Sequence, residues 1–338
     1  MAVTAARRTA PDATSRRTRR ALRWLRQKSR FPWRYGPDER GFRPRPDATG
    51  SMPMMAIVGE GESAFLRILD SMGQGRRLVR GSNIVTPRDR ETCDLRQNNI
   101  QYEDVNKLSV PDYSLLNHAR YFSPFAMVYY SPTRGCYWNK CTFCDYGLNF
   151  NSPTSPWRWR NIDAVLADLT KISRVTKFVY FSVDVLAPAA TVKIAKAIVA
   201  AKLDIRWAAE IRLESYLDAD SCNILKESGC VAVSVGFESG CQRILDRIQK
   251  GTQLDRIEEI ISNFSNAGIA VQMMGFTGFP TETFGEAVET IQFLHRTRSH
   301  WTIAALGDFV LTPGAIVAQQ QARFGLLSKQ RYWCENVP

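Results

Sequence analysis

After residue 123, the chain alternates short apolar runs with longer segments in which apolar residues recur every three or four positions. The short runs have the length of buried strands, and the longer segments have the periodicity of amphipathic helices. Strands are predicted over residues 125–130, 177–182, 204–209, 230–235, 268–277 and 301–311, and helices over 162–172, 189–202, 219–226 and 284–297. Because such alternation is typical of a parallel sheet with crossover helices, we expect an α/β fold of six strand–helix units.

A shorter strand–turn–helix pattern precedes this region. An apolar run over residues 55–58 leads into the glycine-rich turn 59–62, and apolar residues then recur at helical spacing from Phe65. Gly73 is a typical helix end, and Ser63 is suited to cap the beginning of the helix. The pattern therefore predicts a small α/β unit before the larger one.

Positive charge is concentrated at the beginning of the chain. The first 50 residues contain 13 Arg and one Lys against four acidic residues, which gives +10 of the total net charge of +12. We expect a disordered, solvated tail here, although its charge also suits nucleic acid or an anionic surface. The chain is accordingly divided into the tail over 1–52, the small α/β unit with a linker over 53–117, and the six-unit region over 118–338.

Composition indicates the compartment. No run of about 18 apolar residues is present, so we expect no membrane span. The eight cysteines are too unevenly spaced in a chain of 338 residues to suggest a disulfide framework. Thiols that must stay reduced indicate the cytoplasm.

Three cysteines lie within nine residues of one another, in the loop after the first predicted strand of the larger unit. They are Cys136, Cys141 and Cys144. Clustered thiolates are soft ligands that favour zinc or an iron–sulfur centre. A structural zinc site usually takes two pairs of ligands, whereas the other five cysteines are scattered and no histidine lies within ten residues. The triplet suits a four-iron cluster with one open iron; a zinc knuckle and surface thiols are the alternatives.

The triplet resembles the cluster loop of radical S-adenosylmethionine (SAM) enzymes, in which three cysteines hold a [4Fe–4S] cluster and the fourth iron binds SAM. The family spacing is Cys-x3-Cys-x2-Cys, and this chain has one additional residue between Cys136 and Cys141. Phe143 occupies the position where the family packs an aromatic ring near adenine. Further family motifs follow in order, and the resemblance, which covers residues 123–317, implies a partial (βα)6 TIM-like barrel.

The resemblance implies SAM contacts at the ends of the second and third predicted strands. Asp184 lies where the family binds the SAM amino group, with a helix cap as the alternative interpretation. Residues 207–212 resemble a Trp-x-x-Glu-x-Arg ending. Arg212 would then pair with the SAM carboxylate, and Glu210 would orient that arginine or contact the ligand; the alternative is a surface ion pair.

Two later strand ends complete the implied site. The stretch 236–239 resembles a Gly-x-Glu-Ser ending, which places Glu238 and Ser239 near the ribose or the amino-acid part of SAM. Gly278 and Pro280 resemble the turn that lines the adenine site. All these residues follow predicted parallel strands, whose carboxyl ends share one face of a barrel.

Part of the N-terminal third resembles the end of a cobalamin-binding domain that often precedes such a barrel. The likeness rests on Ile-Val-Gly-Glu-Gly-Glu at 57–62 and on the linker-like stretch 110–116. No histidine occurs before His118, so the Asp-x-His-x-x-Gly loop that would ligate cobalt is missing. We interpret residues 53–117 as a remnant of that domain and expect no cobalamin on this chain alone, with a separate cobalamin-binding chain as one arrangement.

The resemblance implies an enzyme that cleaves SAM to methionine and a 5′-deoxyadenosyl radical, which abstracts hydrogen from a small-molecule or peptide substrate. Methylation, cyclisation and peptide or natural-product modification all occur among such relatives. An electron donor such as flavodoxin or ferredoxin is implied, and nucleic acid is not expected as a partner. Two alternatives stay open: a truncated inactive paralogue that only binds the cluster, and a basic zinc protein associated with nucleic acid.

Overall fold

The computed structural model describes residues 56–57, 59–75, 81–85, 100–144, 156–312 and 314–326. They form two compact units, which are divided between Glu103 and Asp104, earlier in the chain than the expected boundary after residue 117. The basic tail predicted over 1–52 lies outside the described residues, as do Cys93 and Cys334. The side chain of Asp184 also lies outside them.

The first unit is a small α/β arrangement. β1 (Ala56–Ile57) pairs antiparallel with β2 (Ile84–Val85), and α2 (Glu62–Gly73) lies between them in the chain. Its buried core consists of Ala64, Ile68 and Ile84.

Helix α2 confirms one expectation and corrects another. It ends at Gly73, as predicted. Its N-cap residue is Gly61, and Ser63 lies inside the first turn instead of capping it. The backbone N–H and the hydroxyl of Ser63 donate to the Glu103 carboxylate at 2.8 and 2.7 Å, so this serine ties the helix to the segment that follows β2.

The second unit is built on a six-stranded parallel sheet. In spatial order, the strands are β3 (Met127–Tyr130), β6 (Phe178–Leu186), β7 (Arg206–Ile211), β8 (Cys230–Glu238), β9 (Ala270–Thr277) and β10 (Ile303–Asp308). Every neighbouring pair is parallel, and the spatial order follows the chain, so each crossover leads to the adjacent strand as in a βα barrel. β3 and β10 lie at the two edges, so strand pairing in the described residues leaves the barrel open.

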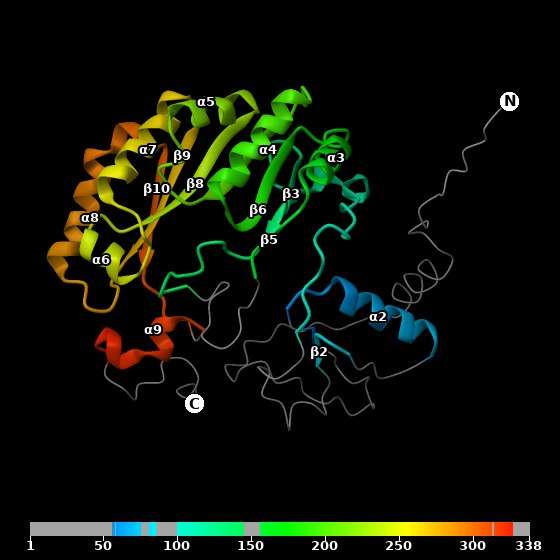
Figure 1. The fold of residues 1–338 in the computed structure, drawn as a ribbon, viewed down its shortest axis with the longest axis horizontal. Helices are drawn as coiled ribbons and strands as arrows, with labels where there is room; N and C mark the ends of the chain where they lie inside the picture. The colour runs from blue at the N-terminus through cyan, green and yellow to red at the C-terminus, as the bar shows by residue number, and fades with distance from the viewer. Residues whose placement is uncertain are drawn as a thin grey trace. The chain divides into compact units, whose positions relative to one another are not determined.

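Helices cover one face of this sheet (Figure 1). They are α3 (Ile162–Ile172), α4 (Pro188–Ala200), α5 (Ala219–Glu227), α7 (Leu254–Asn266) and α8 (Phe284–Arg296), while the shorter α6 (Gln242–Arg247) and α9 (Ile316–Gln319) complete the unit. Strand residues under the helices, such as Phe181, Trp207 and Val235, are at most 1% exposed. Because successive side chains of a strand point to opposite faces, Tyr180 and Ser234 lie on the inner face, where they are partly exposed.

Short polar side chains begin three of these helices. Asn161 and Asp218 accept backbone N–H groups at the beginnings of α3 and α5, at 2.9 and 2.8 Å. Thr283 begins α8 with a capping box. Each cap contributes about 1 kcal/mol. In the described part of the chain, no helix is both long enough and apolar enough to cross a membrane.

A buried ion pair fixes the beginning of the loop that follows β3. Asp168 of α3 accepts hydrogen bonds from the Tyr130 hydroxyl at 2.9 Å and from Arg160 Nε at 2.7 Å. Arg160 follows β5 (Arg158–Trp159), which pairs antiparallel with β4 (Thr133–Arg134). The two ends of the loop between β4 and β5 therefore lie side by side, and this loop contains the three clustered cysteines.

Two glycines in comparable places differ in the space around them. Gly229 and Gly268 each follow a helix and precede a strand, with φ of +91° and +71°. A Cβ at Gly229 would lie 2.0 Å from the Ile205 carbonyl oxygen, whereas the nearest atom at Gly268 would be the flexible Lys226 Nζ at 3.4 Å. We expect Gly229→Ala to lower the free energy of unfolding by about 4 kcal/mol and Gly268→Ala by about 1 kcal/mol, since only the first change forces backbone apart. Urea unfolding measures both losses, and equal losses would contradict this account.

Candidate functional site

The clustered cysteines lie in the loop that leaves the carboxyl end of β3, the face that carries the chemistry in βα barrels. Cys136, Cys141 and Cys144 are partly buried, and none of them forms a disulfide. The backbone N–H of Cys144 donates to the Cys141 carbonyl oxygen at 3.4 Å, so these two belong to one turn. Within the described residues, no three His, Cys, Asp or Glu side chains converge closely enough to hold a single metal ion.

The four residues between Cys136 and Cys141 form a turn of their own. Asn139 has φ of +52°, in the left-handed region that asparagine tolerates, and its N–H donates to Cys136 Sγ at 3.5 Å. The indole N–H of Trp138 donates to the Gln249 carbonyl oxygen at 2.9 Å. A left-handed turn therefore accommodates the additional residue of the spacing.

The same turn is docked on the segment that follows β7. The Trp138 ring centroid lies 3.7 Å from the Arg212 guanidinium carbon. Arg212 is 4% exposed, and it donates to the Glu214 carboxylate and to the Lys250 carbonyl oxygen. The Tyr137 hydroxyl donates to Glu214 at 2.7 Å. Both guanidinium NH groups of Arg212 are thus engaged with protein, and its buried Nε has no hydrogen-bond partner among the residues that the structure describes.

The segment that follows α6 holds the loop on both sides of Cys141. Buried Thr142 donates its N–H to the Ile248 carbonyl oxygen at 2.9 Å. Gly251 leaves room for Trp138, because a Cβ at this glycine would lie 2.4 Å from the indole ring. Tertiary contacts therefore determine the conformation of the cysteine loop.

A buried ion pair lies beside Cys141. Lys250 Nζ is 2.7 Å from Glu238 Oε1, and these residues are 8% and 9% exposed. A Cβ at Gly236 would lie 2.3 Å from Glu238 Oε1 and 3.0 Å from Lys250 Nζ, so the strand needs glycine there. Burial raises the pKa of the Cys141 thiol, and the Lys250 charge acts in the opposite direction. Burial also opposes the charge on Lys250, but Glu238 and Cys141 outweigh it and raise its pKa.

Two other expected SAM contacts have different surroundings. Glu210 lies on the inner face of the sheet, where its carboxylate accepts from the Tyr180 hydroxyl at 3.1 Å. Ser239 is fully buried, and its hydroxyl lies 3.1 Å from Thr290 Oγ1 of α8 and accepts the Cys241 N–H at 3.1 Å. Glu210 is therefore accessible from the inner face, whereas Ser239 is engaged in holding α8; a contact between Ser239 and SAM stays a prediction.

The residues expected near adenine are connected by aromatic packing. The Phe143 ring lies edge-on to Phe276 of β9, with centroids 5.0 Å apart. The turn with Gly278 and Pro280 follows this strand, and the Glu282 carboxylate accepts the Gly278 N–H. A Cβ at Gly278 would meet no atom within 4 Å, so the turn borders open space. The cysteine loop and the Gly278 turn thus reach the same edge of the sheet.

Asp184 lies within β6, where the register with β7 shifts between Phe181 and Leu186. Since its side chain is outside the described atoms, its contact with SAM stays a prediction. The sequence expectations also omitted Trp138, Glu214 and Lys250. Glu214 could have been found because it lies two positions after Arg212, on the same side of an extended chain.

The family model described as the Radical SAM superfamily matches residues 130–294. Residues 130–294 belong to the radical SAM superfamily. The match runs from the last residue of β3 into α8, so it includes all three clustered cysteines. The radical SAM fold and the assignment of the cysteine loop to this family, both expected from the sequence, are confirmed.

The curated relatives of this chain are longer proteins. It is 29% identical over 246 residues to an uncharacterized methyltransferase of Pyrococcus horikoshii, covering 70% of this chain and 51% of the relative. It is 27% identical over 223 residues to a bacteriochlorophyllide d C-12(1)-methyltransferase of Chlorobaculum tepidum, covering 62% and 45%. The chain thus spans about half the length of the curated relatives it matches.

Solved radical SAM structures have the same fold. The methyltransferase TsrM from Kitasatospora setae, with cobalamin and a [4Fe–4S] cluster bound, superposes with a TM-score of 0.64 at 15% identity, over 80% of this chain and 53% of that one. The cobalamin-dependent enzyme OxsB superposes with a TM-score of 0.59 at 16% identity, over 81% and 40%. At these identities the likeness establishes the fold alone.

The radical SAM family implies a [4Fe–4S] cluster and SAM as cofactors, and the donor set fits a cluster. Three thiols that no disulfide consumes lie in one loop, and Cys136 is close enough to Cys141 for its charge to act on that thiol. The buried cations of Lys250 and Arg212 act on Cys141 and compensate negative charge there. Cys136, Cys141 and Cys144 would each supply one thiolate ligand to such a cluster.

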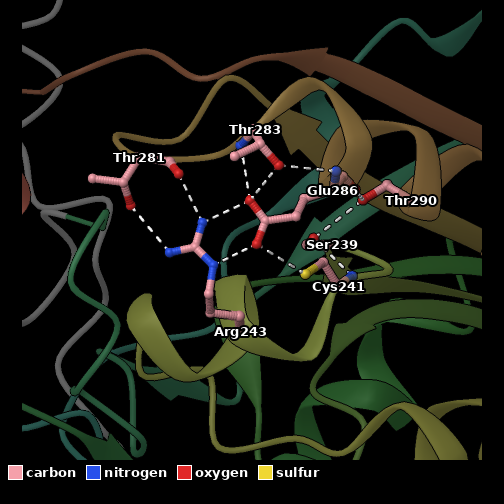
Figure 2. A network of polar contacts seen from close by, with 7 residues as sticks. All are labelled: Ser239, Cys241, Arg243, Thr281, Thr283, Glu286 and Thr290. Carbon is pink, nitrogen blue, oxygen red and sulfur yellow. Dashed lines mark hydrogen bonds and ion pairs between the residues drawn. The ribbon is translucent and has the colours of Figure 1, made fainter.

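A clamp of polar contacts holds the turn after β9 against α6 (Figure 2). Arg243 donates to Glu286 Oε2 and to the Thr281 carbonyl oxygen, each at 2.7 Å. Glu286 also accepts the N–H and the hydroxyl of Thr283 at 2.8 and 2.9 Å. Thr281 has φ of +77°, which is rare for a β-branched residue. The clamp therefore holds a strained turn next to Pro280.

The clamp predicts an acid-dependent loss of stability. The Arg243 guanidinium and the Thr283 N–H hold the pKa of Glu286 well below its ordinary value of 4.5. A carboxyl group whose pKa is lowered by folding stabilises the folded protein at pH values above its ordinary pKa. This stabilisation decreases progressively as the pH falls below the ordinary pKa. We expect Glu286→Gln to lower the melting temperature at pH 7, and the gap to wild type to close as the pH falls below about 4.5.

Melting curves between pH 3 and 8 measure this gap. The matched control is Glu259→Gln, which removes a carboxylate paired with Arg256 on an exposed helix surface. This change should have an effect within about 0.5 kcal/mol at any pH. A gap for Glu286→Gln that stays constant from pH 3 to pH 8 would refute the role of the clamp.

Proposed function

We propose that this chain is a radical SAM enzyme in which Cys136, Cys141 and Cys144 hold a [4Fe–4S] cluster that cleaves SAM reductively. The observation that carries the proposal is the cysteine loop at the carboxyl end of β3, with buried Lys250 and Arg212 beside Cys141, in a chain segment that matches the family. When bound, the cluster supplies one electron that splits SAM into methionine and a 5′-deoxyadenosyl radical. The electron comes from a donor such as flavodoxin or ferredoxin.

The residues around the loop have separate tasks in this proposal. Trp138 and Thr142 fix the loop on its two sides, so that the thiolates are preorganised. Phe143 and Phe276 form an apolar wall that keeps water from the reacting centre. The Gly278 turn offers open space for the adenine, and the clamp at Glu286 holds that turn.

We assign the SAM carboxylate to Arg212 and the amino group to Asp184. Arg212 already donates to Glu214 and to the Lys250 carbonyl oxygen, so it reaches SAM through its remaining Nε–H or after releasing one partner. We assign the ribose of SAM to Glu238 and Ser239, as the sequence resemblance implies. Of these two, Glu238 is the better placed, because Ser239 is bonded to α8.

The inner face of the sheet would receive the substrate. Polar side chains from neighbouring strands bond to each other there: Tyr180 to Glu210 at 3.1 Å, and Ser234 to Gln272 at 2.8 Å. They suit an organic molecule or a peptide with hydrogen-bonding groups. We propose methyl transfer to such a substrate in the cytoplasm, because two curated relatives are named methyltransferases. The methyl group would come from a second SAM molecule, which leaves as S-adenosylhomocysteine, while the 5′-deoxyadenosyl radical from the first removes the substrate hydrogen.

The test is anaerobic incubation of reconstituted protein with SAM and dithionite, followed by mass spectrometry of the products. The proposal predicts 5′-deoxyadenosine and methionine, in amounts that depend on iron content. S-adenosylhomocysteine without 5′-deoxyadenosine would indicate polar methyl transfer and overturn reductive cleavage. Recovery of unchanged SAM from protein that carries a full cluster would support the inactive paralogue.

A further inference from the structure

The buried pair of Lys250 and Glu238 has a second consequence for the cluster. We propose that the Lys250 ammonium, held in place by Glu238, sets the reduction potential of the cluster and makes it easier to reduce. The inference rests on the proposed function in that the cysteines must carry a cluster. It concerns the protein before SAM binds, and it separates Lys250 from the residues that contact SAM.

The pair is rigidly placed. The Nζ–Oε1 distance is 2.7 Å, and both side chains are nearly inaccessible to water. Gly236 leaves the space that the pair fills, and Gly275 of β9 approaches the Glu238 backbone so closely that a Cβ there would lie 2.7 Å from its carbonyl oxygen. Packing on two neighbouring strands therefore fixes where the two charges lie.

Glu238 is held in a strained conformation. Its φ is +66°, in the left-handed region that glycine normally occupies, although it ends a regular strand. Such a conformation costs about 1–3 kcal/mol and persists only where the surrounding structure enforces it. Strained backbone conformations are common at functional sites, and here the strained backbone directs the carboxylate toward Lys250.

Lys250 is tied to the cysteine loop through its own backbone. Its carbonyl oxygen accepts from Arg212, which stacks on Trp138 of the loop. Two residues earlier, the Ile248 carbonyl oxygen accepts the N–H of Thr142, the residue after Cys141. The segment that carries the ammonium is therefore held against the cysteine loop on both sides of Cys141.

Reduction adds one negative charge to the cluster. Net charge, hydrogen bonds to sulfur and solvent exposure determine the reduction potentials of such clusters. A cation in a buried site of low dielectric constant stabilises the added electron, and an anion destabilises it. The Lys250 ammonium is such a cation, carried by the segment that contacts the cysteine loop, and the Glu238 carboxylate paired with it acts in the opposite direction.

The experiment is a potentiometric titration of the reconstituted full chain without SAM, followed by electron paramagnetic resonance (EPR). We expect Lys250→Met to lower the reduced-to-oxidised ratio at a fixed potential about tenfold, which is 59 mV for one electron. Glu238→Gln should shift the ratio in the opposite direction. The double variant should lie between the two single variants, and Lys250→Arg, which keeps the charge, should stay close to wild type.

Shifts of the same sign in both single variants would overturn the proposal, as would unshifted potentials in variants with full iron content. If the Lys250→Met protein loses its cluster, the test rests on Glu238→Gln alone. Glutamine keeps the shape of the side chain, and the Lys250 ammonium remains in place. A shift that appears only after SAM is added would place Lys250 on SAM instead and refute the inference. Wild-type protein that takes up no iron would defeat the proposed function itself, which is a different outcome.

Discussion

Cys141→Ala should abolish both cluster binding and the formation of 5′-deoxyadenosine from SAM and dithionite. With one of three thiolates removed, a four-iron cluster loses the ligand beside Lys250, and the loop contains no replacement donor between Cys136 and Cys144. We expect product to fall by about a hundredfold or more, because the cluster is the electron source. Iron per chain and mass spectrometry of the nucleoside measure the two losses.

The matched control is Cys222→Ala. This cysteine lies in α5 and is fully buried, and its thiol donates to the Leu217 carbonyl oxygen at 3.9 Å. The change should cost about 1–2 kcal/mol of stability through a small cavity and leave iron and product at wild-type levels. Cys141→Ala protein that kept four irons and full product would remove this cysteine from the ligand set.

Arg212→Lys should reduce iron content as well as SAM cleavage. Lysine has no planar group to stack on Trp138. It also cannot donate hydrogen bonds to Glu214 and to the Lys250 carbonyl oxygen at the same time. Loss of these contacts should cost about 2–3 kcal/mol and loosen the turn between the first two cysteines. Iron per chain, the unfolding midpoint and the KM for SAM are the measurements.

These measurements separate two roles of Arg212. If Arg212 serves only the SAM carboxylate, its substitution raises the KM for SAM and leaves iron content and stability unchanged. That outcome would contradict its role in holding the loop. The control is Arg206→Lys at the beginning of the same strand, where an exposed arginine lies 3.9 Å from Asp204 and its exchange should change stability by less than about 0.5 kcal/mol.

Much of the fold could be predicted because it follows from local periodicity. The helix expected over 162–172 is α3 with the same bounds and with Asn161 as its cap. Two strands are longer than the sequence predicted, because β6 continues to Leu186 and β8 to Glu238. Pairing with neighbouring strands extends both of them beyond their apolar runs. Helix α7 was omitted, although Ile257, Ile260, Ile261 and Phe264 recur at helical spacing.

The site was only partly predictable because its decisive contacts join distant residues. The cysteine triplet is local and could be read directly. In contrast, Lys250 and Glu238 are 12 positions apart, and Arg212 meets the Lys250 carbonyl oxygen 38 positions away. No single-sequence pattern reports such pairs. The same holds for the additional residue between Cys136 and Cys141, whose explanation requires the docking of Trp138 on Arg212.

The central claim is that this loop carries a SAM-binding [4Fe–4S] cluster. The most direct measurement is EPR of anaerobically reconstituted, dithionite-reduced protein, before and after the addition of SAM, with iron and zinc quantified in the same sample. The account predicts about four irons per chain, a reduced-cluster signal whose shape changes when SAM binds the open iron, and negligible zinc. A colourless protein with one zinc per chain and no signal would contradict it.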